Sequence, residues 1–282
     1  MRKMLLAAAL AAAGCAHSAS GDLEARVARI EQTLVKYNEA LDFLNKVYAE
    51  QKAQADARER EEPDPDAMFA VDVAQDVRDG TVDGPPTAVV TIIKCFDFAC
   101  PHCARMAPAL DEVVKQYAGK VRVVYKHMVV HPDVAMPAHL ASCAAAKQGK
   151  YMAFKAAWWD KGYGPYAASQ GADRSSMSED NILKIAADAG LDVGKLKTDM
   201  ASVACKQSIT GDMTELAKFH VNGTPTLFIN GTEIPGAIDK SELVSIVDAK
   251  IKEAEKSGIP ARDYYDKVVM AKGEKQFKSK KK

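Results

Sequence analysis

The sequence predicts an α/β fold in which a βαβ unit and a ββα unit flank a block of helices, with one long helix before them. An apolar run over 88–93, a proline that suits a helix start, and a second apolar run over 121–128 indicate the βαβ unit. Segments rich in Ala, Lys and Leu, interrupted by glycines, fill residues 133–219. Asn230-Gly231 between two short apolar runs then predicts a hairpin, because this dipeptide favours tight two-residue turns.

The composition is that of an ordinary globular protein. Hydrophobic residues make up 48% of the 282 residues and charged residues 27%. Lys plus Arg and Asp plus Glu each number 38, so the net charge is zero. No overall field therefore favours nucleic acid as a partner.

The first residues are typical of an export signal rather than of a folded domain. Arg2-Lys3 precedes an apolar run over 4–13 that is too short to cross a bilayer. The following Gly-Cys resembles a bacterial lipoprotein signal, which predicts a signal peptide over 1–14, lipid attachment at Cys15 and a spacer up to residue 22. An ordinary secretory signal with an incidental cysteine is the alternative. Either interpretation exports the chain and permits disulfides.

A strict heptad pattern predicts a coiled-coil helix over 23–58. Apolar residues alternate four and three apart, as they do along a coiled-coil seam. They are Leu23, Val27, Ile30, Leu34, Tyr37, Leu41, Leu44 and Tyr48. We expect residues 23–48 to join copies of the chain into a homo-oligomer, dimer or trimer; the alternative is a helix that packs on its own catalytic domain. Charged residues and two prolines predict a linker over 59–70.

The remaining boundaries follow from turn and capping residues. A single α/β domain is expected over 71–258, with its first helix beginning at Pro101 and its last helix capped by Asp239. Residues 259–282 are rich in lysine and predict a solvated basic tail. Contact of this tail with anionic lipid or cell-wall polymer is the alternative.

Cys100-Pro101-His102-Cys103 carries the chemistry that the sequence predicts. A cysteine at the start of a helix meets unpaired N–H groups and the helix dipole, which stabilise its thiolate and lower its pKa. His102 can add positive charge or a hydrogen bond to the same sulfur. We expect an exposed Cys100 to form the mixed disulfide and a shielded Cys103 to resolve it.

Zinc binding and a purely structural bridge are the alternatives for this pair. A structural zinc site needs four ligands, and neither a second Cys-x-x-Cys nor a ligand-like histidine pair accompanies it. A structural disulfide that spans only two residues would constrain almost nothing. The sequence therefore predicts a redox-active disulfide between Cys100 and Cys103. It predicts no metal and no cofactor.

Two motifs resemble the DsbA-like thiol–disulfide oxidoreductases of the thioredoxin superfamily. Residues 96–103 (Phe-Asp-Phe-Ala-Cys-Pro-His-Cys) resemble their active site, and residues 221–231 (Val-Asn-Gly-Thr-Pro-Thr-Leu-Phe-Ile-Asn-Gly) resemble their cis-proline loop. The resemblance covers about 70–258 and implies a thioredoxin fold with a helical insertion. It also implies a cis-Pro225 opposite the redox pair, Thr224 offering backbone hydrogen bonds to a substrate strand, and a membrane partner that re-oxidises the pair.

Lys94 departs from this family pattern. It stands six residues before Cys100, where family members often place an acid that accepts a proton from the inner cysteine. A charged lysine cannot do so, which leaves Asp97 and Lys126 as weak candidates; for each, a merely solvated or paired charge is the alternative.

The other cysteines predict one structural disulfide. Cys143 lies in the first helix of the insertion and Cys205 in its last, and we expect a bridge between them. Two buried thiols are the alternative. Cys95 lies in a strand and is expected to be a small buried core residue.

These features together predict an enzyme of the cell envelope that exchanges disulfides with unfolded or reduced exported proteins. Pro101-His102 resembles a strongly oxidising pair, so we favour dithiol oxidation through Cys100. The predicted coiled coil resembles the segment that makes some relatives oligomeric isomerases. A disulfide isomerase or reductase is therefore the first alternative. An envelope tether, or a metal- or peptide-binding lipoprotein, is the alternative of another class.

Overall fold

The computed structural model describes the backbone of residues 5–281 and the side chains of residues 21–38 and 40–281. The chain divides into two units, one formed mainly by the N-terminal helix and one that spans Pro63–Lys280. The predicted signal over 1–14 and the lipid attachment at Cys15 lie outside the described side chains. Within the described residues, no helix has an apolar stretch of the length that a membrane crossing needs.

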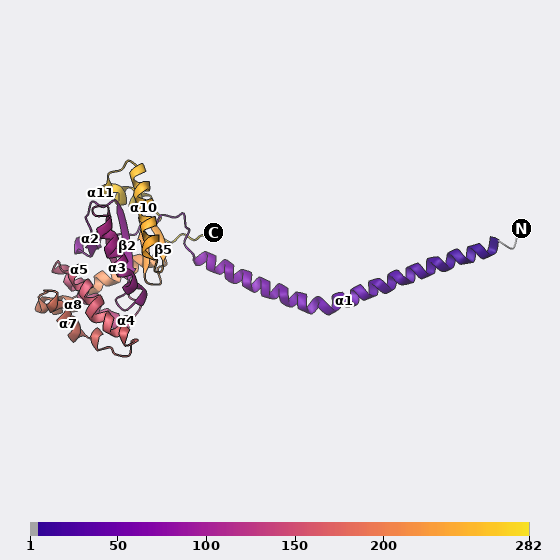
Figure 1. Cartoon of the computed structure of the whole chain (residues 1–282), viewed down its shortest axis with the longest axis horizontal. Helices are drawn as coiled ribbons and strands as arrows, with labels where there is room; N and C mark the ends of the chain where they lie inside the picture. The colour runs from indigo at the N-terminus through magenta and orange to yellow at the C-terminus, as the bar shows by residue number, and fades with distance from the viewer. Residues whose placement is uncertain (1–4, 282) are drawn as a thin grey trace. The chain divides into compact units, whose positions relative to one another are not determined.

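A single helix, α1 (Leu5–Glu61), forms the first unit (Figure 1). The eight apolar heptad residues from Leu23 to Tyr48 are 45–67% exposed. The predicted linker over 59–70 is wrong at both of its ends. Charged residues with good helix propensity carry α1 to Glu61, where Pro63 stops it. Residues 67–71 belong to the second unit, because Ala67, Phe69 and Val71 are buried in its core.

A five-stranded sheet in the order β1-β3-β2-β4-β5 forms the centre of the second unit. Its strands are β1 (Val82–Asp83), β2 (Val90–Phe96), β3 (Val121–His127), β4 (Thr226–Ile229) and β5 (Thr232–Pro235). β2 runs parallel to β3 and antiparallel to β4. Every residue of β2 and β3 is buried, as expected for central strands covered on both faces. The predicted βαβ–insertion–ββα fold class is confirmed; the short edge strand β1 was not foreseen.

The β4–β5 hairpin is anchored to the start of β2 by its turn. Asn230 and Gly231 both have positive φ, 45° and 87°, as the tight hairpin turn requires. The Asn230 side chain accepts the N–H of Thr91 at 2.8 Å and donates to the carbonyl of Val89 at 3.1 Å. The dipeptide that predicts the turn therefore also fixes β4 beside β2, and with it the loop that precedes β4.

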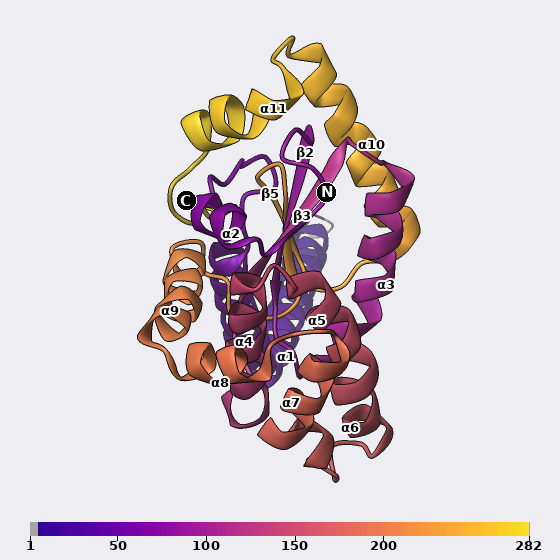
Figure 2. The ribbon, with the colours of Figure 1, turned by 90° about the vertical axis from the view of Figure 1, so that its left-hand side faces the viewer.

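Helices cover both faces of the sheet (Figure 2). α3 (Pro101–Gln116) and α10 (Lys240–Lys256) contact each other on one face. α2 (Ala74–Asp79) and α9 (Val203–Ala217) pack on β3 on the other side. Asp239 caps α10, its side chain accepting the N–H of Glu242. The short α2 was not foreseen.

The helical insertion lies between β3 and β4 and gathers at one end of the sheet in Figure 2. Before α9 it comprises α4 (Pro132–Lys147), α5 (Tyr151–Trp158), the π-helical turn η1 (Trp159–Tyr163), α6 (Gly164–Ala168), the 3-10 turn η2 (Ser175–Met177), α7 (Glu179–Asp188) and α8 (Val193–Ala201). A disulfide between Cys143 and Cys205, with Cα atoms 5.7 Å apart, joins α4 to α9. The structure thus contains the expected bridge.

The C-terminal segment folds on the second unit, which corrects the expectation of a solvated basic tail over 259–282. α11 (Ala261–Tyr264) and the π-helical turn η3 (Tyr265–Met270) bury both tyrosines and Val269. The Tyr265 hydroxyl donates to the carbonyl of Val71 at 2.7 Å. Phe277 stacks on Phe69, with ring centroids 6.5 Å apart. The lysine-rich composition of this segment obscures its few apolar residues in the sequence pattern. These residues are buried, whereas the lysines between them stay solvated.

Candidate active site

Cys100 sits where β2 has ended and α3 begins. It is the N-cap residue of α3, with φ −80° and ψ 120°, and Pro101 occupies the first helical position. Its sulfur accepts the N–H of Cys103 at 3.4 Å, which satisfies one of the unpaired donors of the first turn. Both cysteines are free thiols here, so the structure shows the pair in its reduced form.

The two sulfurs differ strongly in acidity. The Cys103 thiol donates a hydrogen bond to the Cys100 sulfur, which is the largest cause lowering the pKa of Cys100 to about 5. Backbone N–H groups of Cys103 and His102 add to this shift. Burial raises the pKa of Cys103 well above its ordinary range. At neutral pH Cys100 is therefore a thiolate and Cys103 a protonated thiol.

The exposure expected for Cys100 is wrong. The residue is only 3% exposed, and Cys103 is fully buried. The loop before β4 covers it, since the carbonyl oxygen of Thr224 lies 3.2 Å from the Cys100 sulfur.

The loop carries the cis peptide bond that the resemblance implies, between Thr224 and Pro225. The hydroxyl of Thr226 donates to the carbonyl of Gly223 at 3.0 Å, and the N–H of Gly236 donates to the carbonyl of Pro225 at 2.8 Å. The Thr224 hydroxyl is buried and lacks a hydrogen-bond partner within the described part of the chain.

The His102 side chain was expected to act on the Cys100 sulfur, but it does not point toward it. It is exposed, and its Nδ1 lies against the guanidinium of Arg105. An imidazole nitrogen that accepts from arginine carries no proton of its own. His102 thus acts on Cys100 through its backbone N–H alone.

The side chains of Asp97 and Lys126, the two candidate proton acceptors for Cys103, are engaged with other groups. The Asp97 carboxylate accepts the N–H groups of Ala99, Val130 and His131 at 2.6–2.9 Å, which clips the loop before Cys100 to the loop after β3. Lys126 is held between two carboxylates, with Asp76 at 2.6 Å and Asp212 at 2.8 Å. Lys94, by contrast, is buried beside the redox pair, its Nζ 3.1 Å from the carbonyl oxygen of Cys103.

A buried histidine pair behind the redox loop was missed by sequence reasoning, which found no paired histidines. Nδ1 of His127 lies 2.8 Å from Nδ1 of His139, and Nε2 of His139 accepts the N–H of Phe98 at 3.3 Å. Burial lowers the pKa of both rings, so both are neutral. Their spacing of twelve residues across a strand and a helix leaves no local signal. No group of side chains suited to hold a metal occurs within the described residues.

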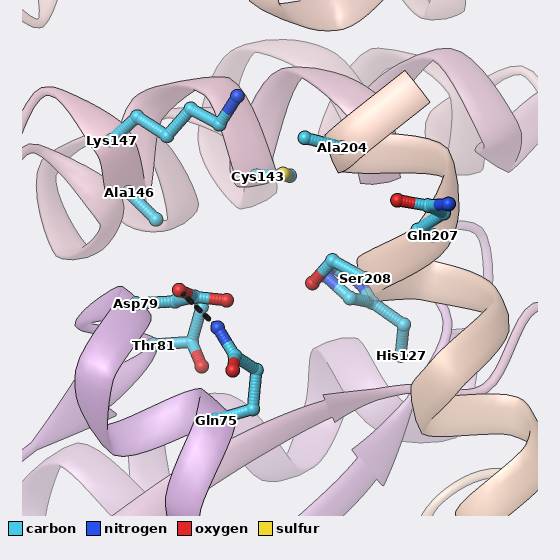
Figure 3. Close-up of a pocket in the computed structure, with 10 residues that line it drawn as sticks. All are labelled: Gln75, Asp79, Thr81, His127, Cys143, Ala146, Lys147, Ala204, Gln207 and Ser208. Carbon is cyan, nitrogen blue, oxygen red and sulfur yellow. Dashed lines mark hydrogen bonds between the residues drawn. The ribbon is translucent and has the colours of Figure 1, made fainter. Parts of the chain in front are cut away.

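A pocket of about 350 Å³ is lined by His127 of this pair. Figure 3 shows His127 and Ser208 facing Gln75, Asp79 and Thr81 across it. Cys143 of the structural disulfide also lines it, whereas neither redox cysteine does. The pocket is therefore separate from the Cys100–Cys103 site.

Comparison with known proteins agrees with the fold and with the redox pair described above. A family model described as thioredoxin matches residues 76–249. A solved thioredoxin-like oxidoreductase from Silicibacter pomeroyi is 29% identical, with a TM-score of 0.52, and the match covers 62% of this chain and 98% of that one. Oxidised BdbD from Bacillus subtilis, at 17% identity and a TM-score of 0.54, shares the fold; there the match covers 66% of this chain and 98% of that one.

Curated relatives are much longer proteins. The Na(+)/H(+) antiporter NhaA of Herminiimonas arsenicoxydans is 24% identical over 64% of this chain and 27% of its own length. For NhaA 3 of Salinispora tropica the identity is 31%, over 64% of this chain and 26% of its own length. The chain thus spans about a quarter of the length of the curated relatives it matches.

Proposed function

We propose that this chain, which belongs to the thioredoxin family and is a thiol–disulfide oxidoreductase of that type, forms disulfides in exported proteins. One observation carries the proposal: Cys100 caps the N-terminus of α3, with its sulfur 3.4 Å from the N–H of a fully buried Cys103. This arrangement lowers the pKa of Cys100 to about 5, while burial raises that of Cys103. A stabilised Cys100 thiolate stabilises the reduced pair, so the Cys100–Cys103 disulfide accepts electrons readily.

The reaction balances through the two cysteines alone. A substrate thiolate attacks the Cys100 sulfur of the oxidised pair, and Cys103 leaves as a thiolate that takes up a proton. A second substrate thiolate attacks the substrate sulfur of this mixed disulfide, and Cys100 leaves as a thiolate. The substrate loses two electrons and two protons. The pair gains both electrons and must be re-oxidised by an electron-accepting partner, for which we propose a membrane protein.

The loop around cis-Pro225 is proposed to hold the substrate chain. The Thr224 hydroxyl lacks a partner in the described part of the chain, and the Thr224 carbonyl lies 3.2 Å from the reacting sulfur. An extended substrate segment that pairs with this loop would bring its cysteine next to Cys100. Such strand addition reads the backbone rather than the sequence, which suits an enzyme that acts on many unfolded proteins.

Two substrates separate oxidation from isomerisation. We expect the oxidised enzyme to convert a reduced, unfolded protein to its disulfide form in a stoichiometric burst. We expect the reduced enzyme to rescue a scrambled protein far more slowly. The reduction potential of the pair, measured against glutathione, gives the same ranking independently. Efficient rescue of scrambled protein without net oxidation would instead establish the isomerase function.

We also propose that residues 23–48 of α1 join copies of the chain in parallel. The heptad residues are exposed along the whole stretch, and an isolated helix gains nothing by exposing them. In heptad register Arg26 and Glu31 occupy the flanking positions that meet between parallel copies, where their charges are opposite. A second copy therefore fits this seam in both apolarity and charge.

The double substitution Leu34→Glu, Leu41→Glu is expected to convert the oligomer to a monomer. Buried like charges at the two seam layers on either side of Tyr37 cost more than the apolar contacts that remain can offset. Mass in solution by light scattering, over a range of concentrations, measures the change. The matched control is Lys36→Gln, Glu50→Gln, at positions outside the seam and its flanks, which leaves the mass unchanged. A wild-type chain that is already monomeric at high concentration contradicts the proposal.

We propose that the enzyme works in the cell envelope, because its first residues are typical of an export signal. We propose that residues 1–14 direct export and that Cys15 carries a lipid anchor. Mass spectrometry of the membrane-extracted protein tests the lipid directly. A tether function without catalysis is the competing proposal, and a Cys100→Ser strain that keeps every cellular phenotype of the wild type would favour it.

A further inference from the structure

Three lysines are buried in the second unit, and one differs from the others. Lys126 is held by two carboxylates, and Lys155 contacts a carboxylate of Asp111 at 3.2 Å and the hydroxyl of Tyr125 at 2.7 Å. Lys94 is 1% exposed and forms no ion pair among the described residues. An unpaired ammonium in the interior is costly, so burial favours the neutral amine.

Lys94 lies directly beside the inner redox cysteine. It belongs to the central strand β2, and its Nζ donates to the carbonyl of Cys103 at 3.1 Å. The Trp159 ring, 6.0 Å from Nζ, lies against it from the insertion. A single hydrogen bond leaves the rest of the amine free to exchange a proton within this closed space.

Cys103 needs such a partner. Its sulfur is fully buried, and burial raises the pKa of its thiol. The sulfur must nevertheless become a thiolate whenever it attacks, and must take up a proton whenever it leaves. Asp97 and Lys126, whose side chains are fully engaged elsewhere, cannot serve it.

We propose that the side-chain amine of Lys94 exchanges this proton with the sulfur of Cys103. When the Cys100–Cys103 disulfide is opened by substrate, the Lys94 ammonium gives its proton to the departing Cys103 thiolate and becomes an amine. In the reverse direction the amine takes the proton of the Cys103 thiol, and the resulting thiolate attacks the mixed disulfide at Cys100. In this reverse step the substrate leaves as a thiolate, and the Lys94 ammonium then releases its proton to solvent. After the forward step the amine regains its proton from solvent.

The charges around Lys94 suit this role. Burial lowers its pKa to about 8, near the working pH of a general acid–base group. Thiolate charge at Cys103 and Cys100, and the carboxylate of Asp111, raise that pKa, whereas the Lys155 ammonium lowers it. In the mixed disulfide Cys100 carries no charge, so Lys94 then releases its proton more easily. Its protonation thus follows the redox state of the pair.

The inference rests on the proposed exchange function, and resolution of a mixed disulfide as a function of pH tests it. We expect the wild-type rate to rise with pH through the ionisation of Lys94. Lys94→Met should lose this inflection and resolve about 10²-fold more slowly at neutral pH, the lower end of the usual range for acid–base groups. Lys94→Glu should recover the rate, with its inflection moved to the pH at which the new carboxyl ionises. Lys115→Met, at an exposed lysine of α3, the helix that carries Cys103, is the control.

Thiolate absorbance supplies a readout that does not require activity. In a Cys100→Ala background, replacing Lys94 by methionine should move the ionisation of Cys103 to higher pH. Lys94→Met should also melt no lower than wild type, because it removes a buried unpaired amine. An unchanged pH profile and an unchanged Cys103 titration in a folded Lys94→Met protein would overturn the inference. A wild-type protein that forms no mixed disulfide would instead overturn the proposed exchange function, while the titration still decides the role of Lys94.

Discussion

Replacing Cys100 by serine is expected to abolish disulfide exchange, with a loss of about 10³-fold or more. The Cys100 thiolate is held by the Cys103 thiol and by N–H groups of the first helical turn. A serine hydroxyl in the same place stays protonated, and its oxygen cannot form the mixed disulfide. Insulin reduction and oxidation of a reduced protein substrate both measure the loss.

Two companion variants make this result specific. Cys103→Ser keeps the nucleophile, so it should react once and accumulate a mixed disulfide that is visible on a non-reducing gel. Cys95→Ser removes the third free thiol of the described side chains, which is fully buried in β2, and should keep activity. Exchange activity that survives in Cys100→Ser, or a mixed disulfide trapped on Cys95, would contradict the assignment.

The sequence predicted those parts of the site whose signals lie within a short stretch of residues. The helix-starting Pro101 and the Asn230-Gly231 turn each fix a short stretch of backbone, so both ends of the active site were placed in advance. Contacts between distant segments left no such signal. The cover that Thr224 forms over Cys100, the turn of His102 toward Arg105 and the pairing of His127 with His139 all depend on how helices dock.

The same limit explains the errors at the edges of the second unit. Phe69 and Phe277 stand in segments whose composition is charged and proline-rich or lysine-rich. Only the folded structure shows that the two rings stack on each other. It also shows that the hydroxyl of Tyr265, near the C-terminus, donates a hydrogen bond to the carbonyl of Val71. Single apolar residues spaced irregularly in a polar segment carry no helical or strand period, so pattern reasoning passes over them.

A buried charge network that sequence reasoning also missed ties two helices to the sheet. Lys126 of β3 lies between Asp76 of α2 and Asp212 of α9, and all three are at most 7% exposed. Asp212 also accepts the N–H of His127 at 2.8 Å. One ammonium faces two carboxylates, so a negative charge is left in excess. Burial, with the neighbouring Asp212 charge, raises the pKa of Asp76 to about 7.

Lys126→Met is expected to destabilise the protein by about 5 kcal/mol at mildly alkaline pH, the upper end for a broken buried ion pair. Two carboxylates would then face each other without a cation. Asp76 would be protonated more easily than in the unfolded chain, where the ordinary pKa of its carboxyl is 3.8. Between that pH and the raised pKa the folded state binds more protons, so stability falls as pH rises through this window. Denaturant unfolding at about pH 5 and about pH 8 should show a smaller loss at the lower pH.

Asp76→Asn is the matched variant for this network. It removes the excess carboxylate and leaves the Lys126–Asp212 pair, which should cost far less than Lys126→Met. It should also flatten the pH dependence between 3.8 and about 7, because the group that titrates there is gone. Equal losses in the two variants at every pH would mean that packing, rather than charge, holds α2 and α9 to β3. A loss confined to Lys126→Met and relieved by acid would show that the lysine holds two carboxylates together in the interior.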